Sequence, residues 1–485
     1  MLNTNNNEGV EDIVLINPDP KGDGLNEATI EPPLGLGYIA ALVQEHNFTC
    51  RIIDANLLHL NDNEIIEHIS PATKLIGIYL NSFSYNSVKT LASLIKSKRK
   101  NSILLLGGPL PSVMPEIILH EISCDGIIRG EGEYPVLRVI TNLDSCKPAF
   151  EGNIPGLYYY NGENLVSRPA ERIVDLDKLP FPSYELFPPL TRYKTRNRKS
   201  PSAAMITSRG CPFQCTFCSK DVFPGVPTFR SAENVLKEIE YLVKNFGIRQ
   251  IDILDDNFTQ DKKRLEAILD GIIANHHSLA INLQSGVRIE ALDEAVLLKM
   301  KKAGVYKIAF GIESADEEVL KINKKRLDLK KLENIVRLAK RMNFLVYGFF
   351  VIGLPGETEA GFKKTMDFAR SLDFDIANFC MAIPFVGTEL YKMVEKNGRF
   401  LVDTSRNINT GFYGGRVFFE YGTSRENEIS KRFTTAYKEF YNLSKQIKII
   451  LKIRSLKEAI WLIDAVKFVL KGLKGTILTG KLVQN

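Results

Sequence analysis

The sequence predicts an α/β protein with two parallel sheets in succession and a helical region at its carboxyl end. Short runs rich in Val, Ile and Leu recur along the chain, and amphipathic segments of ten or more residues separate most of them. Such alternation is typical of parallel sheets, because each crossover between parallel strands needs a helix. A chain of 485 residues suggests two to four domains. We predict domains at 10–145 and 200–400, a connector at 146–199, and the helical region at 401–485.

The first domain is predicted to be a doubly wound, Rossmann-like parallel sheet. Its expected strands are 13–18, 50–54, 75–80, 102–108 and 126–129, with a helix over 34–45. Ligands of such sheets bind beyond the carboxyl ends of the strands. Asp54, Asn56, Gly107 and Gly108 follow or end predicted strands, and glycine lets the backbone approach a bulky ligand closely. We therefore name these four residues as candidate cofactor contacts.

The connector contains a predicted hairpin and a proline-rich strap. Asn161-Gly162 separates two β-like runs, and Asn-Gly is the strongest short hairpin signal. The prolines between 179 and 189 exclude a regular helix or a central strand. We expect this stretch to be extended, with its aromatic side chains as packing anchors.

The second domain is predicted to be a partial (β/α)6 barrel. Six apolar runs recur with helices between them, at 203–208, 251–254, 281–284, 307–312, 345–352 and 376–383. Six units are fewer than the eight of a closed barrel. In barrels of this kind the chemistry lies at the carboxyl ends of the strands, so the loops after these runs are where we look for a site.

Three cysteines follow the first of these runs. Cys211, Cys215 and Cys218 have the spacing C-x3-C-x2-C. Cysteine thiolates are the usual ligands of iron–sulfur clusters, and three of them leave one iron open, as in a catalytic site. The alternative is a zinc knuckle, but zinc usually takes four ligands in spaced pairs, and no His or second Cys pair lies close by.

This cysteine loop, on a turn after an apolar strand and with Phe217 before its last cysteine, resembles the radical SAM superfamily. The resemblance implies that Cys211, Cys215 and Cys218 bind a [4Fe-4S] cluster. It also implies that the open iron takes the amino and carboxylate groups of S-adenosylmethionine (SAM).

The first domain resembles the cobalamin (B12)-binding domain that precedes the radical SAM core in one large subgroup. The matching stretches are Pro-Pro-Leu-Gly-Leu at 32–36, Asp-Ala-Asn at 54–56, Gly-Gly-Pro at 107–109 and Arg-Gly-Glu-Gly-Glu at 129–133. The chain has Lys21 where mutase-type domains carry a cobalt-ligating His, so the resemblance implies cobalamin without a histidine ligand. A doubly wound domain that binds something else is the alternative.

The resemblance also implies roles for residues at later strand ends. Asp255 or Asp256 would contact the SAM ammonium, unless it caps the following helix. Arg288 would bind the SAM carboxylate, unless it forms a surface salt bridge with Glu290. Glu313 and Ser314 would lie near the SAM ribose or amine. The turn at 353–358 would border the adenine and ribose.

The implied function is that of a cobalamin-dependent radical SAM enzyme, most simply a C-methyltransferase that generates a 5′-deoxyadenosyl radical. A radical cyclase or rearrangement enzyme is the alternative. A tRNA methylthiotransferase is less favoured, because Cys50, Cys124 and Cys146 form no matching pattern. A cobalamin or redox sensor would bind cobalamin without SAM.

The distribution of charge and of cysteines indicates which cellular compartment and which kinds of partner to expect. The net charge of +6 is concentrated from Lys445 to Asn485, where nine basic and two acidic residues occur, so a general nucleic-acid binder is not indicated. Scattered cysteines and the absence of a signal peptide suggest the cytoplasm. We expect a small-molecule or lipid-type substrate and an external electron donor of the flavodoxin or ferredoxin kind.

The carboxyl-terminal region is predicted to form two helices. The first, over 426–441, follows Ser424, a reasonable cap, and is expected to dock on the barrel. The second is an amphipathic basic helix over 445–482, which is either a further cap on the barrel or a peripheral membrane contact.

Overall fold

The computed structural model describes residues 10–20, 30–193, 198–275, 278–406 and 416–451. The chain divides into two compact units. The first comprises Met1–Lys194 together with Lys220–Thr228, and the second comprises Thr195–Ser219 together with Phe229–Asn485. The predicted connector therefore lies mostly in the first unit, and so does a short segment that follows the cysteine loop.

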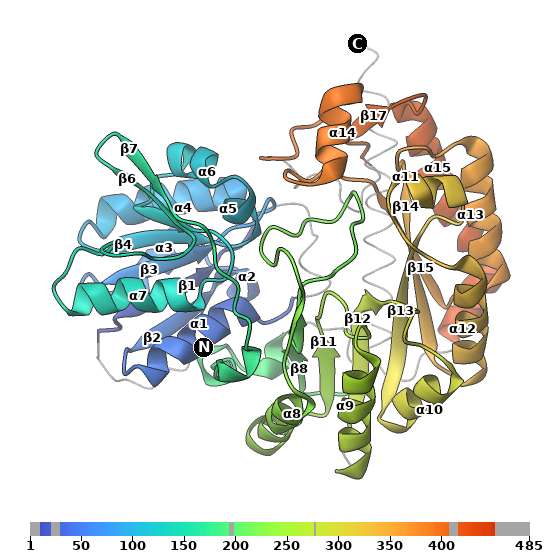
Figure 1. Cartoon of the computed structure of the whole chain (residues 1–485), viewed down its shortest axis with the longest axis horizontal. Coiled ribbons are helices and arrows are strands. Elements are labelled where there is room, and N and C mark those ends of the chain that lie inside the picture. Colours follow the sequence, from blue (N-terminus) through green and yellow to red (C-terminus); the bar gives the residue numbers. More distant parts are fainter. Residues whose placement is uncertain (1–9, 21–29, 194–197, 276–277, 407–415, 452–485) are drawn as a thin grey trace. The chain divides into compact units, whose positions relative to one another are not determined.

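The first unit contains a seven-stranded sheet in the order β2-β1-β3-β4-β5-β6-β7 (Figure 1). Its strands are β1 (Ile13–Asn17), β2 (Cys50–Asp54), β3 (Leu75–Tyr79), β4 (Ile103–Gly107), β5 (Gly126–Ile128), β6 (Leu157–Asn161) and β7 (Asn164–Ser167). Its helices are α1 (Leu34–Glu45), α2 (Ala55–Leu58), α3 (Asp62–Glu67), α4 (Tyr85–Lys98), α5 (Pro109–Val113), α6 (Pro115–Glu121) and α7 (Glu133–Asp144).

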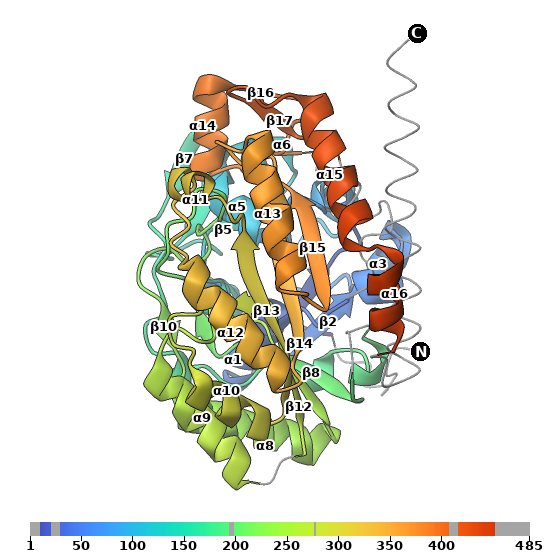
Figure 2. The same cartoon turned by 90° about the vertical axis from the view of Figure 1, so that its right-hand side faces the viewer.

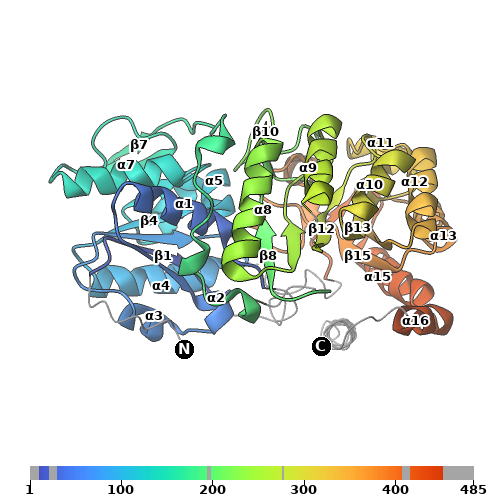
Figure 3. The same ribbon diagram turned by 90° about the horizontal axis from the view of Figure 1, so that it is seen from below.

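The first five strands are parallel. β2 is added on one side of β1, and β3 to β5 are added on the other side, as in a doubly wound sheet. All five residues of β1 are buried, because helices cover both faces of the sheet. Figure 3 shows α1 and α7 along one face and α3 and α4 along the other. The predicted strands and the helix at 34–45 are confirmed to within two residues.

The predicted hairpin also forms, and it extends the first sheet. β6 pairs antiparallel with β5 and with β7, and Gly162 in the turn has φ of 62°. Single turns of 3-10 helix follow at Leu176–Lys178, Tyr184–Leu186 and Leu190–Arg192. The prolines of this stretch explain why no longer helix forms there.

The second unit contains six parallel strands in the order β15-β14-β13-β12-β11-β8. They are β8 (Ser202–Met205), β11 (Gln250–Ile253), β12 (Ala280–Val287), β13 (Val305–Glu313), β14 (Leu345–Ile352) and β15 (Ile376–Met381), and a short pair is formed by β9 (Ser208–Arg209) and β10 (Thr228–Phe229). In the described part of the chain β8 and β15 remain edge strands, so the barrel is partial, as predicted.

Helices connect these strands and cover the outer face of the sheet (Figure 2). They are α8 (Ala232–Phe246), α9 (Lys262–Ala274), α10 (Glu294–Lys302), α11 (Glu317–Ile322), α12 (Leu329–Arg341) and α13 (Glu359–Ser371), and α14 (Glu389–Asn397) follows the last strand. Side chains at their N-caps fix where they begin: Ser231, Asp261, Asp293, Asp316, Asp328, Thr358 and Thr388 each accept a backbone N–H. Each such cap stabilises its helix by about 1 kcal/mol.

Helix α15 (Glu426–Phe440) packs against β14 and β15, which confirms the predicted helical cap on the barrel. A short antiparallel pair, β16 (Gly398–Phe400) and β17 (Phe419–Tyr421), precedes it. The prediction that Ser424 caps this helix is wrong. The N-cap position belongs to Arg425, and the Ser424 hydroxyl donates to the carbonyl of Glu357 at 3.2 Å instead.

Helix α16 (Leu443–Ile450) begins the basic segment, and its lysines contact Asp373, which follows α13 in the same unit. Lys445 Nζ lies 2.8 Å and Lys448 Nζ 3.3 Å from the Asp373 carboxylate, whereas Ile447 and Ile450 are exposed. The rest of the predicted helix, from 452 to 482, lies outside the described residues. None of the helices in the described ranges is both long and apolar enough to cross a bilayer.

Candidate functional site

The cysteine loop is anchored at its centre by Thr216. The Thr216 N–H donates to the carbonyl of Asn323 at 3.1 Å, and its hydroxyl donates to Asn323 Oδ1 at 3.0 Å. The Leu390 N–H, at the start of α14, donates to the Thr216 carbonyl at 2.8 Å. Two elements distant in sequence therefore hold the residue that follows Cys215.

The three thiols differ in environment. A hydrogen bond from Cys218 lowers the pKa of Cys215 to about 6, although burial opposes this, and the cations Lys325 and Arg288 add to the lowering. The same hydrogen bond raises the pKa of Cys218, and burial raises the pKa of Cys211. The thiolate is the form that binds metal, so cations next to this loop favour the state that a cluster requires.

Two carboxylates after β11 hold the beginning of the cysteine loop. Asp255 accepts the Thr207 N–H at 2.6 Å and the hydroxyls of Thr207 and Ser208 at 2.5 and 2.6 Å. Asp256 accepts the Gly210 N–H at 2.8 Å. Burial raises the pKa of Asp255, and these hydrogen bonds oppose the rise.

The alternative that Asp255 or Asp256 caps the following helix is wrong, because Asp261 caps α9. The structure gives the two carboxylates a different local role, at the cysteine loop. Their contact with the SAM ammonium stays a prediction.

Arg288, after β12, lies against the cysteine loop. Its guanidinium stacks on the Phe213 ring at 3.6 Å from the centroid and contacts Glu290 at 2.7 Å. It also donates to the carbonyl of Arg326. The alternative salt bridge with Glu290 is therefore present, but the Arg288 side chain is only 12% exposed, so this is not an ordinary surface pair. A contact with the SAM carboxylate stays a prediction.

Glu313, at the end of β13, forms a buried ion pair with Lys325 at 2.8 Å. Glu313 has φ of 63°, an uncommon value outside glycine that often marks functional sites. A Cβ on Gly311 would lie 2.8 Å from Glu313 Oε1 and 3.1 Å from Lys325 Nζ, so the glycine makes room for the pair. Sequence reasoning missed Lys325; its run of basic neighbours at 324–326 looks like a solvated surface.

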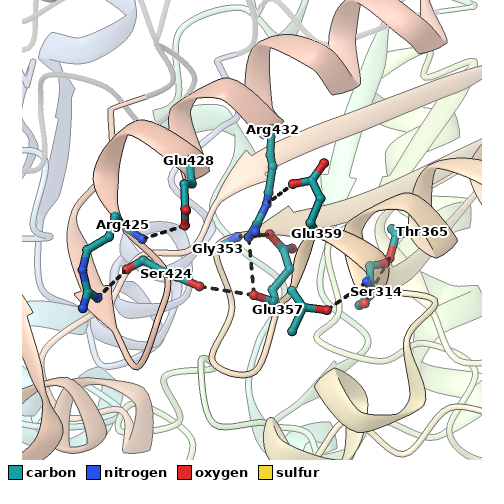
Figure 4. Close-up of polar contacts among 11 residues, drawn as sticks. Ser314, Gly353, Glu357, Glu359, Thr365, Ser424, Arg425, Glu428 and Arg432 are labelled. Atoms are coloured by element: carbon teal, nitrogen blue, oxygen red, sulfur yellow. Dashed lines mark hydrogen bonds and ion pairs between the residues drawn. The ribbon is translucent and has the colours of Figure 1, made fainter.

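The Ser314 hydroxyl contacts two nearby residues, Thr365 and Asp316. Its hydroxyl lies 3.1 Å from Thr365 Oγ1 and accepts the Asp316 N–H at 3.1 Å (Figure 4). The residue is fully buried. These contacts shape the start of α11, and the predicted role of Ser314 near SAM stays a prediction.

The turn at 353–357 after β14 is fixed by the C-terminal helix (Figure 4). Arg432 Nη1 lies 3.1 Å from Glu357 Oε1, and Ser424 binds the Glu357 carbonyl. Gly353 has φ of 84°, and a Cβ there would lie 3.0 Å from Ile429 Cγ2, so α15 packs directly on glycine backbone.

A further residue at this edge of the sheet has an unused donor. Asn257 is buried, and its Nδ2 has no hydrogen-bond partner among the described residues. It follows Asp256, whose carboxylate binds the cysteine loop. An unsatisfied buried amide costs free energy unless a ligand fills its hydrogen bond. Together with three cysteines and the nearby cations Arg288 and Lys325, it fits a site for a cluster with an amino-acid-like ligand.

At the carboxyl edge of the first sheet, Asp54 is fully buried. Its carboxylate accepts Asn17 Nδ2 at 2.8 Å, Tyr193 Oη at 2.7 Å and the Leu57 N–H at 3.2 Å. Burial raises the pKa of Asp54. Asn56 lies two residues further along, in α2. The structure thus gives Asp54 a clear structural task, and its role in cofactor binding, like that of Asn56, stays a prediction.

The two glycines after β4 differ. Gly108 has φ of 112°, and a Cβ there would lie 2.7 Å from the Leu80 carbonyl oxygen, so glycine is required by the chain itself. Gly107 is less crowded, with the Ile128 carbonyl oxygen 3.8 Å from such a Cβ. The predicted contact of Gly107 and Gly108 with a bulky cofactor such as cobalamin stays a prediction. Lys21, the expected place of departure from the mutase motif, lies outside the described residues.

Comparison with known proteins identifies both units. The Radical SAM superfamily profile matches residues 205–369, and the B12 binding domain profile matches residues 21–140. An uncharacterised methyltransferase of Pyrococcus horikoshii is 32% identical over 85% of this chain and 88% of its own length. A cytidylyl-2-hydroxyethylphosphonate methyltransferase of Streptomyces wedmorensis is 25% identical, over 76% of this chain and 78% of its own.

An anaerobic magnesium-protoporphyrin IX monomethyl ester cyclase of Rubrivivax gelatinosus is 26% identical, over 78% of this chain and 69% of its own. Among solved structures, the cobalamin-dependent SAM radical enzyme OxsB, with aqua-cobalamin and SAM bound, has a TM-score of 0.73 at 18% identity and covers 98% of this chain and 73% of its own. The radical SAM methyltransferase TsrM from Kitasatospora setae, with cobalamin and a [4Fe-4S] cluster bound, has a TM-score of 0.70 at 14% identity, over 96% of this chain and all of its own.

These matches confirm the predicted fold class, the enzyme class and the cofactor set of [4Fe-4S] cluster, SAM and cobalamin. The assignment of individual residues to those cofactors remains our prediction. The chain belongs to the radical SAM superfamily, in the group whose members carry a B12-binding domain before the radical SAM core.

Proposed function

We propose that this enzyme is a C-methyltransferase that methylates an unactivated carbon of a small-molecule or lipid-type substrate. One observation carries the proposal: over 85% of its length this chain is 32% identical to a protein named an uncharacterised methyltransferase. Its three-cysteine loop follows β8, the first strand in chain order of the six-stranded parallel sheet. When bound, the cluster and SAM supply a 5′-deoxyadenosyl radical, and cobalamin supplies the methyl group. Such cofactors carry the hard chemistry, and the protein binds, orients and excludes side reactions.

The residues of the chain divide these tasks. Cys211, Cys215 and Cys218 would hold the cluster, with Asp255 and Asp256 fixing the loop in front of them. Glu313, Lys325 and Asn257 Nδ2, which has no hydrogen-bond partner among the described residues, offer polar contacts for SAM at the same edge of the sheet.

The reaction balances with two SAM molecules. Each turnover converts one C–H bond to C–CH3 and releases methionine, 5′-deoxyadenosine and S-adenosylhomocysteine. It consumes two electrons, which a low-potential donor of the flavodoxin or ferredoxin class would supply.

The test is an anaerobic assay with reductant, cobalamin and SAM that carries a CD3 methyl group. We expect 5′-deoxyadenosine, S-adenosylhomocysteine and a product in which one CD3 group has replaced one hydrogen atom of the substrate. The Cys215→Ala protein should form neither 5′-deoxyadenosine nor the labelled product. Release of 5′-deoxyadenosine at the wild-type rate by Cys215→Ala would overturn the assignment of the cluster.

The second candidate is radical cyclisation or rearrangement without methyl transfer, and the 26% identity to the cyclase of Rubrivivax gelatinosus supports it. The same assay separates the two reactions. A cyclase would release 5′-deoxyadenosine but transfer no CD3 group to the product.

We also propose that the enzyme acts in the cytoplasm, without nucleic acid as substrate, and that its basic C-terminal segment contacts an anionic membrane surface. The exposed side chains of Ile447, Ile450 and Leu451 beside lysines support the membrane contact. Co-sedimentation with phosphatidylserine-containing vesicles, comparing residues 1–485 with 1–444, tests it. Equal and negligible binding of both proteins would refute it.

A further inference from the structure

Asn323 is a fully buried residue at the carboxyl end of α11, and its side chain joins two separate segments. Its Oδ1 accepts the Thr216 hydroxyl at 3.0 Å, in the cysteine loop. Its Nδ2 donates to the Pro355 carbonyl at 2.9 Å, in the turn after β14, and to the Val319 carbonyl at 2.8 Å. One amide therefore spans from the cysteine loop to the 353–357 turn.

The orientation of this amide is determined by its neighbours. Two carbonyl oxygens, from Val319 and Pro355, face one end of the group, and a carbonyl cannot donate a hydrogen bond. The nitrogen must be at that end, because the flipped amide would set oxygen against oxygen. The Asn323 oxygen is thereby directed at Thr216.

Thr216 is held from a second side as well. Its N–H binds the Asn323 carbonyl at 3.1 Å, and its own carbonyl accepts the Leu390 N–H at 2.8 Å. Every polar group of this buried residue is thus used within the protein. A fully satisfied buried network specifies one conformation, since any shift leaves a polar group unpaired.

We propose that Asn323 and Thr216 are positioning residues, which set the place of the cluster loop relative to the 353–357 turn. The inference rests on the proposed function insofar as the loop holds the cluster. Neither side chain is a cluster ligand, so their effect is on geometry. A displacement of about 1 Å in a catalytic constellation costs about a hundredfold in rate.

The test compares Thr216→Val with Thr216→Ser. Valine has the shape of threonine without its hydroxyl, and serine keeps the hydroxyl. Thr73→Val is the matched control, because Thr73 is also buried but its hydroxyl has no hydrogen-bond partner among the described residues. The measurements are iron and sulfide per chain, the change in the cluster EPR signal on adding SAM, and kcat and KM for reductive SAM cleavage.

We expect Thr216→Val to keep wild-type iron and sulfide, to give a weakened or altered EPR response to SAM, and to lose roughly ten- to a hundredfold in kcat/KM for SAM cleavage. Thr216→Ser should recover most of the loss, and Thr73→Val should match the wild type in all readouts. Asn323→Asp should show the same defect more strongly, because it places a carboxylate oxygen against the carbonyl oxygens of Val319 and Pro355.

Two results would overturn the proposal. One is wild-type SAM cleavage and EPR response in Thr216→Val. The other is a loss of iron in proportion to the loss of rate, which would make the role one of cluster retention. Failure of the methyltransferase proposal is a separate outcome, because SAM cleavage is measured without a methylated product.

Discussion

Arg432 Nη1 lies 3.1 Å from Glu357 Oε1, and this pair connects the C-terminal helix to the turn after the fifth barrel strand. The Arg432 side chain is 7% exposed and the Glu357 side chain 4%. Arg432 also donates to the Glu357 carbonyl at 3.4 Å and contacts Glu359 at 3.2 Å, while the Gly353 N–H donates to Glu357 (Figure 4). The turn thus depends on a residue 75 positions away in the sequence.

Replacing Arg432 by methionine should destabilise the second unit. The substitution leaves Glu357 buried without its cation, and breaking a buried pair from one side typically costs about 3–5 kcal/mol. The double variant Arg432→Met/Glu357→Leu removes both charges, so we expect it to recover most of that stability. Urea unfolding followed by far-UV circular dichroism measures the difference.

Arg370→Met is the matched control. Arg370, on α13, also contacts α15, through Glu439, but both side chains of that pair are more than 40% exposed. Exposed ion pairs contribute about 0–1 kcal/mol, so the urea midpoint of Arg370→Met should hardly differ from that of the wild type. Equal destabilisation by Arg370→Met and Arg432→Met would contradict the assigned importance of burial.

Stability should fall as the pH rises from about 4.5 to 7. Burial raises the pKa of Glu357 to about 7, and Arg432 opposes the rise. In that window the folded chain keeps a proton that the unfolded chain has lost, so each unit of pH costs at most about 1.4 kcal/mol. Glu357→Gln should have a flatter profile. Thermal midpoints of both proteins from about pH 5 to 8 test this, and parallel curves would refute it.

Asp255→Asn should weaken the cysteine loop. The carboxylate accepts three donors, from the backbone and hydroxyl of Thr207 and from Ser208, whereas an amide sets an NH2 group against some of them. We expect a loss of at least half of the iron and sulfide in anaerobically purified protein. Asp261→Asn is the control, since asparagine caps a helix as well as aspartate does. Full iron content in Asp255→Asn would show that the loop does not need the carboxylate.

The strands were predictable from the sequence because their signals are local, and the run at 345–352 matches β14 residue for residue. The helix starts were less predictable: the expected cap Ser424 is not at the N-cap of α15, and Asp261 caps α9 in place of Asp255 or Asp256. The position of the cysteine loop, after the first strand of the second domain, was likewise predictable from the spacing of Cys211, Cys215 and Cys218. The strands and the cysteine loop depend on periodicity and spacing, which a sequence displays directly.

The supports of the site were not predictable, because they join residues far apart in the chain. Asn323 lies 107 positions from Thr216, and Lys325 resembles part of a surface run. Asp255 was expected to face a ligand or cap a helix, yet its carboxylate accepts hydrogen bonds from Thr207 and Ser208. A buried polar residue outside a motif carries no local signal of its partner.

Arg172 makes a comparable long-range connection inside the first unit. Its Nε lies 2.8 Å from Glu131, whose side chain is 1% exposed. Its other nitrogens donate to the Pro224 carbonyl at 2.7 Å and to Thr228 Oγ1 at 3.2 Å. A single planar guanidinium thus holds the segment that follows the cysteine loop at two points, and lysine has no such fork.

Arg172→Lys should expose that segment to trypsin. The variant keeps the charge and the tryptic site at 172 but loses at least one of the fork's hydrogen bonds, at a cost of about 1–2 kcal/mol. Local opening then becomes roughly 5- to 30-fold more frequent, and cleavage after Lys220 should accelerate to match. Arg168→Lys is the control, because the Arg168 guanidinium donates to the carbonyl of its sequence neighbour Ser167, in a solvent-exposed hydrogen bond. Mass spectrometry of the fragment ending at Lys220 gives both rates, and equal rates in Arg172→Lys and wild type would show that the guanidinium does not hold the segment.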